Sequence, residues 1–217
     1  GQNWFTFLYH GACAWAGEGL DRDYFNEAYS RLIHGATDGN IARAFCLSGD
    51  ISNQTIKTVQ SDGTVTDAPS THFWEFFGDP FTHKSLTAMA DPAAEGARIL
   101  KQADEAVLIL LAAQTTATRN TDNLEQMYFG ARNYQALGHK LMALAHYRDA
   151  TYDRAAVATE LDSVAAEYET QKADFQRMWI AEDKQNPGFQ VHLDRFDWTI
   201  ASCRAQAAAL RPPTTVP

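Results

Sequence analysis

Over roughly residues 91–210, apolar residues recur every three or four positions. That period predicts four long amphipathic helices separated by short breaks, and short breaks favour antiparallel neighbours in an up-down bundle. The expected buried faces include Ile99, Ala103, Val107 and Leu110, then Leu124, Met127, Ala131 and Leu141, then Val157, Leu161, Val164 and Tyr168, and finally Leu193, Phe196, Ile200 and Cys203.

The first fifty residues have a different pattern, that of a strand, a glycine-rich loop and a helix. Residues 4–9 are strongly apolar and residues 11–19 are rich in glycine and alanine. Asp21 is placed to cap a following helix and Gly35 to end it. A second short helix is expected over residues 38–47. This order is typical of one β/α unit, which cannot form a domain alone. Because the chain starts with such strongly apolar residues, we also expect a further segment upstream of them.

A connecting segment, roughly residues 51–90, is expected to hold a small hairpin. Residues 55–59 and 64–66 alternate apolar and polar residues around Ser61-Asp62-Gly63. The aromatic stretch 73–81 follows, and two interpretations of it stay open. It is either a wedge that packs one part of the protein on another or an exposed platform on which a sugar ring stacks.

Charge and composition exclude several classes of protein. The 217 residues have a net charge of −9, and no cluster of lysine and arginine suggests a nucleic-acid partner. The longest apolar run, residues 107–113, is too short to span a bilayer. Cys13, Cys46 and Cys203 form no CxxC pair, so neither a zinc site nor a disulfide framework is indicated.

No motif for a metal, a cofactor or a nucleophile stands out. The Glu-x-x-His pairs of a di-iron bundle and the HExxH, GxSxG, Walker and GxGxxG patterns are absent. His139 and His146 share one helical face, but no carboxylate lies at the right offset to complete a metal site. We therefore expect no cofactor and no metal.

Trp15 and Glu18 form the best candidate site. If a strand ends near Trp15, both side chains project at its C-terminal end, where barrel enzymes build their active sites. An indole offers a flat apolar face to the C–H face of a pyranose, and a nearby carboxylate accepts hydrogen bonds from sugar hydroxyls. The alternative is a buried tryptophan beside a solvated glutamate, both with structural roles only.

Three segments resemble the family 20 β-N-acetylhexosaminidases. Residues 11–18, GACAWAGE, resemble the last barrel strand, where a tryptophan and a glutamate line the pocket of the terminal sugar. Residues 20–35 are similar to the final barrel helix of bacterial members, and residues 175–186 to the closing helices of the bundle that follows. Here Trp15 and Glu18 are separated by two residues, where one is common in the family.

The resemblance implies a mainly α chain with the last β/α unit of a (β/α)8 barrel (1–50), a connecting segment (51–90) and an up-down antiparallel bundle (91–217). In that family the substrate's acetamido group is the nucleophile, assisted by an adjacent Asp-Glu pair on a middle strand. No such pair ends a strand here. The chain is thus expected to be the C-terminal portion of an exo-acting glycosidase, with substrate-binding residues Trp15 and Glu18 but no catalytic residue.

The expected partners are a carbohydrate substrate and an upstream barrel segment or companion chain, with no nucleic acid and no membrane span. Two other functions stay open. One is a non-catalytic helical module that binds a protein partner, in which the N-terminal segment belongs to the module's own core. The other is a carbohydrate-binding module that acts alone.

Overall fold

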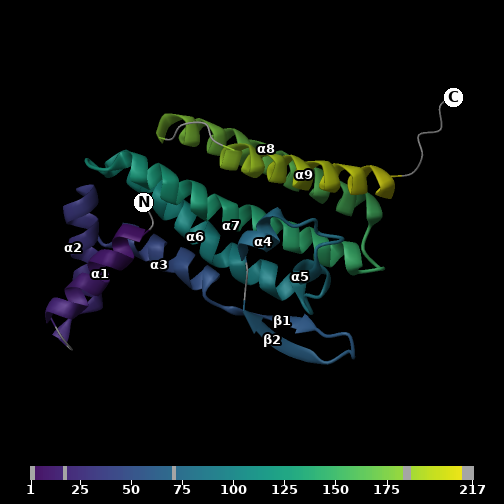
Figure 1. Ribbon diagram of the computed structural model, residues 1–217, viewed down its shortest axis with the longest axis horizontal. Helices are drawn as coiled ribbons and strands as arrows, with labels where there is room; N and C mark the ends of the chain where they lie inside the picture. Colours follow the sequence, from purple (N-terminus) through teal and green to yellow (C-terminus); the bar gives the residue numbers. More distant parts are fainter. Residues whose placement is uncertain (1–2, 17–18, 70–71, 183–186, 212–217) are drawn as a thin grey trace. The chain divides into compact units, whose positions relative to one another are not determined.

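The computed structural model describes residues 3–16, 19–69, 72–182 and 187–211, and most of them are helical (Figure 1). The mainly α class is therefore confirmed. In chain order the elements are α1 (Asn3–Ala16), α2 (Arg22–His34), α3 (Asn40–Ser52), β1 (Thr55–Val59), β2 (Val65–Pro69), α4 (His72–Phe77), α5 (Lys84–Thr87), α6 (Pro92–Thr116), α7 (Thr121–Arg148), α8 (Arg154–Glu182) and α9 (Pro187–Leu210). No helix in the described ranges is long and apolar enough to cross a membrane.

The prediction of a strand that ends near Trp15 is wrong, because Asn3–Ala16 forms helix α1. A central barrel strand needs a neighbour on each side to pair with its backbone N–H and C=O groups. The strands in the described ranges are β1 and β2, and they pair with each other. A helix satisfies the same backbone groups within the segment, so an apolar run without a partner strand can become helical.

Helix α2 begins and ends where its sequence predicts. The Asp21 carboxylate accepts hydrogen bonds from the backbone N–H groups of Asp23 and Tyr24 at the N-terminus. At the C-terminus, Gly35 has a φ of 64°, and its N–H donates to the Arg31 carbonyl. The segment that resembles the final barrel helix is thus a capped helix.

The contacts divide the chain into two compact units, and each unit takes segments from two places in the sequence. The first contains residues 1–51 and 101–132, and the second contains residues 52–100 and 133–217. Helices α6 and α7 are each divided between the two units.

The core of the first unit includes the N-terminal segment. The Phe5 ring, only 8% exposed, lies 4.9 Å from the ring of Tyr29 and 4.7 Å from that of Phe45. These rings pack with apolar residues of α3, α6 and α7, which include Ile41, Ala42, Ala44, Ala106, Leu110, Leu124 and Met127. An apolar residue from the start of the chain thus stabilises the chain's own helices.

His34 lies fully buried at the end of α2, and we therefore expect the first unit to be sensitive to acid. Neither ring nitrogen makes a hydrogen bond of standard geometry within the described residues, although backbone groups of Arg119 and Asn120 lie near enough to favour the charged form. Burial lowers the pKa of the imidazole below its usual range, and this effect is larger than the opposing effect of the Arg119 and Asn120 backbone. As the pH falls below about 6.5, the unfolded chain therefore binds a proton that the native state does not, and stability decreases.

We expect the free energy of unfolding to fall between pH 7 and pH 5, and to fall less in His34→Leu. Urea denaturation at both pH values measures the difference. His10→Leu is the matched control, because His10 is exposed, and this variant should keep the wild-type pH dependence. Equal pH dependence in wild type and His34→Leu would show that His34 does not cause the acid sensitivity.

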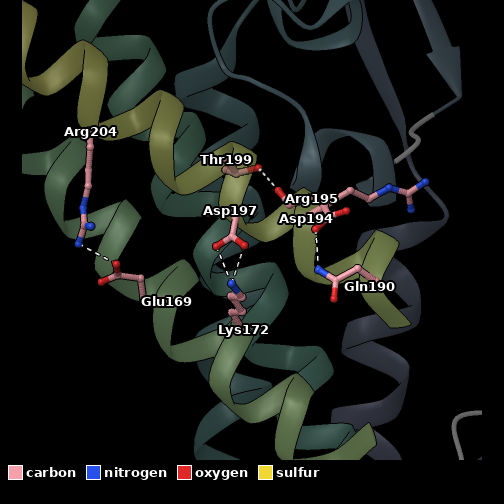
Figure 2. A network of polar contacts seen from close by, with 8 residues as sticks. All are labelled: Glu169, Lys172, Gln190, Asp194, Arg195, Asp197, Thr199 and Arg204. Atoms are coloured by element: carbon pink, nitrogen blue, oxygen red, sulfur yellow. Dashed lines mark hydrogen bonds and ion pairs between the residues drawn. The ribbon is translucent and has the colours of Figure 1, made fainter. Parts of the chain in front are cut away.

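In the second unit, α8 and α9 lie side by side and antiparallel (Figure 1). Ion pairs join Lys172 to Asp197 at 2.5 Å and Glu169 to Arg204 at 2.8 Å, and a third joins Asp162 to Arg211 (the first two in Figure 2). As the residue number falls along α8, the partner's number rises along α9 and reaches Arg211 just after this helix ends. The order of these pairs shows that the expected antiparallel packing holds for these two helices.

The expected hairpin is also present in the second unit. β1 and β2 pair antiparallel, with Thr55 opposite Pro69 and Val59 opposite Val65. The other edge of β1 contacts residues 88–90: the Val59 N–H donates to the Ala88 carbonyl at 2.7 Å, and the Ala90 N–H donates to the Lys57 carbonyl at 2.8 Å. The hairpin is therefore attached to the chain just before α6.

Helices α6 and α7 approach each other closely within the second unit, at Gly96 and Gly138. A Cβ atom at Gly138 would lie 2.6 Å from the Leu100 Cγ and 3.3 Å from the Gly96 carbonyl oxygen. A Cβ atom at Gly96 would lie 3.0 Å from the Gly138 oxygen. The 2.6 Å distance is shorter than real Cβ contacts, and the 3.0 and 3.3 Å distances would require the neighbouring backbone to shift by a few tenths of an ångström. The crossing is therefore closest at Gly138, where a larger residue has no space.

Candidate functional site

The structure gives a position to one of the two residues expected to bind sugar. Trp15 lies near the C-terminal end of α1, and its side chain is 94% exposed. Glu18 lies outside the described residues. The indole of Trp15 is therefore accessible to a ligand, while its expected pairing with Glu18 stays a prediction.

A second aromatic site, not expected as a unit from the sequence, lies in the second unit. It is a cavity of about 330 Å³, which we call the tryptophan groove. The residues that line it include Trp74, Phe77, Asp79 and His83 from α4 and the loop after it, and Arg195, Trp198 and Thr199 from α9. Trp74 is 50% exposed and Trp198 is 76% exposed, so both indoles reach solvent.

Hydrogen bonds join the two sides of the groove. The Thr199 hydroxyl donates to the Phe77 carbonyl at 2.9 Å, and the Ser202 hydroxyl donates to the Asp79 carboxylate. The other oxygen of Asp79 accepts the backbone N–H groups of Phe81 at 2.7 Å and Thr82 at 3.0 Å. The Asp79 carboxylate is therefore fixed in position by the loop that carries it and by α9.

Arg195 contributes a positive charge to the groove. Its guanidinium lies 5.2 Å from the centre of the Trp74 ring and 5.9 Å from that of Phe77, distances typical of cation–π contacts. Figure 2 shows the Arg195 side chain pointing away from Lys172 and the α8–α9 ion pairs. One side of α9 thus binds α8, and another side forms the groove.

Lys140 of α7 holds the groove's aromatic segment from the inside. Its ammonium donates to the carbonyls of Glu75 at 2.5 Å, Phe76 at 2.6 Å and Gly78 at 2.9 Å. The Tyr168 hydroxyl also donates to the Phe76 carbonyl, at 2.6 Å. Burial lowers the pKa of Lys140 to about 7, because it removes the water that stabilises the charged form. The last turn of α4 is therefore fixed by side chains of α7 and α8.

The His83 ring packs closely beside Gly78, just after α4. Burial, and the nearby positive charge of Lys140, lower the pKa of the His83 imidazole, so it is mainly neutral at pH 7. A Cβ atom on Gly78 would lie 2.6 Å from the His83 Cγ and 2.7 Å from the Trp74 carbonyl oxygen. Glycine is therefore required for the ring to pack against the end of α4.

In the structure, His139 and His146 of α7 each pair with a carboxylate of α8. These two pairs were not expected from the sequence. His139 Nδ1 donates to Glu167 at 2.7 Å, and His146 Nδ1 donates to Glu160 at 2.8 Å. Both histidines and both glutamates are seven residues apart, a repeat that could have indicated two facing helical stripes. Among the described residues, no group of three or more His, Cys, Asp or Glu side chains is placed to hold a metal ion.

In comparisons with known proteins, no family model, curated protein or solved structure matches the chain.

Proposed function

We propose that this chain is the C-terminal, mainly helical portion of an exo-acting glycosidase similar to the β-N-acetylhexosaminidases. In this proposal it supplies part of the wall of the sugar pocket, and the catalytic acid lies in an upstream barrel segment or companion chain. The observation on which the proposal rests is the exposed indole of Trp15, within the residues that resemble the family's last barrel strand. An exposed indole can stack on the C–H face of a pyranose.

The proposal includes a change of conformation in residues 3–16. In a complete barrel, neighbouring strands would take the hydrogen bonds that α1 satisfies internally, and the segment would become a strand. Such a change requires the strand pairing to contribute more free energy than is lost when Phe5 leaves the core of the first unit.

Replacing Trp15 with alanine in the intact enzyme should lower kcat/KM by at least about tenfold, or about 1.4 kcal/mol of transition-state binding. A chromogenic N-acetyl-β-glucosaminide is the substrate. Tyr24→Ala is the matched control, since Tyr24 is an exposed aromatic residue of the neighbouring helix α2. It should leave kcat/KM near the wild-type value. An unchanged value in a correctly folded Trp15→Ala enzyme would contradict the proposal.

A second function, a non-catalytic helical module that binds a protein partner, is favoured by one observation. Phe5 lies in the core of the first unit, so the N-terminal segment stabilises the chain's own fold. A monodisperse chain that unfolds cooperatively by itself would support this module. Recovery of the native species together with a companion chain of barrel size would support the glycosidase instead.

A further inference from the structure

We propose that the tryptophan groove of the second unit binds a neutral pyranose sugar, as a site separate from Trp15. Trp15 belongs to the first unit, and every residue that defines the groove belongs to the second. The groove proposal does not depend on the glycosidase proposal. It therefore applies whether the chain is part of an enzyme or a binding module.

The aromatic walls supply the apolar half of sugar recognition. Trp74 and Trp198 expose 50% and 76% of their surfaces, although indoles are among the side chains that gain most from burial. The axial C–H groups of a pyranose form an apolar face that fits against an indole ring. The cation–π contact with Arg195 favours the observed orientation of Trp74, which reduces the side-chain entropy lost on binding.

The polar groups of the groove supply the other half. Arg195 can only donate hydrogen bonds and Asp79 can only accept them, so together they match a hydroxyl group, which does both. A carboxylate has about four acceptor positions. Asp79 accepts from Phe81, Thr82 and Ser202, which leaves capacity for one sugar hydroxyl.

Charge and size narrow the class of ligand. One positive and one negative side chain line the groove, which favours a neutral ligand over a phosphate or a carboxylate. A cavity of about 330 Å³ lies at the lower end of the range for small-molecule sites, so it fits one or two sugar rings. Lys140, Tyr168 and Thr199 fix the backbone of residues 75–78, so the groove exists before the ligand binds.

The test is a titration of the full chain with cellobiose and with N,N′-diacetylchitobiose, followed by tryptophan fluorescence and by the indole N–H signals in NMR. We expect saturable binding with a Kd of about 1 mM or below. Trp198→Ala should weaken binding at least about tenfold, and Trp198→Phe should retain part of the affinity. Ile180→Ala is the control, because Ile180 is exposed on α8 and is not among the groove's residues; its affinity should stay at the wild-type value.

Three results would overturn the groove proposal. The first is no saturable change up to about 50 mM sugar. The second is binding that is lost in Trp15→Ala but kept in a folded Trp198→Ala. The third is a mass that rises with concentration in the wild type but not in Trp198→Ala, which would make the groove a protein contact. Loss of enzyme activity in Trp15→Ala with intact groove binding would support both proposals, so the two can fail separately.

Discussion

Replacing Lys140 with methionine should lower the free energy of unfolding by about 3 kcal/mol, since removing one member of a buried polar network leaves its partners unsatisfied. Methionine has nearly the same length but cannot donate to the carbonyls of Glu75, Phe76 and Gly78. Urea denaturation followed by circular dichroism measures the loss. Because these carbonyls end α4, the tryptophan groove should also lose its shape.

Lys172→Met is the matched control for this prediction. Lys172 is the same type of residue, but its ion pair with Asp197 lies near the surface, where such pairs contribute about 1 kcal/mol or less (Figure 2). The loss should therefore be several times smaller than in Lys140→Met. Similar losses in the two variants would show that the buried hydrogen bonds contribute no more than an exposed ion pair.

Replacing Gly138 with valine should destabilise the protein by about 3 kcal/mol, because the new side chain has no space between α6 and α7. The first added carbon would already lie 2.6 Å from Leu100 Cγ, and the valine methyl groups need still more room. Either Leu100 leaves its rotamer or the helices move apart, and both changes reduce packing. Chemical denaturation at one fixed pH gives the difference in stability.

Gly49→Val separates this packing effect from helix propensity. Gly49 also lies within a helix, α3, but a Cβ atom there would meet no heavy atom within 4 Å. Valine forms helices slightly better than glycine, so this variant should be neutral or slightly more stable. If both valine variants behaved alike, the close approach at Gly96 and Gly138 would not limit stability.

The helices of the second half were predictable because their apolar periodicity extends over several turns. The caps at Asp21 and Gly35 were predictable because they depend on local backbone geometry alone. Residues 3–16 were not, because a short apolar run fits a strand or a helix equally well. Its conformation depends on whether a partner strand is available, which the run itself does not encode.

The candidate site was harder to predict than the fold. Trp74 and Trp198 are far apart in the sequence and share no period, so only the packing of α4 on α9 brings them to one groove. Lys140 looks like a solvated residue on a helix, since lysine is rarely buried. Its burial depends on the carbonyl groups at the end of another helix, and sequence patterns do not report such tertiary partners.

The open edge of strand β2 affects how copies of this chain associate at high concentration. Within the described residues β2 pairs only with β1, so its other edge presents unpaired backbone groups. Such an edge can pair with another chain and start aggregation, and natural proteins counter this with charges and prolines. β2 contains Asp67 and ends at Pro69, which has no N–H to donate. The edge therefore disfavours strand addition, and self-association should involve side-chain surfaces instead.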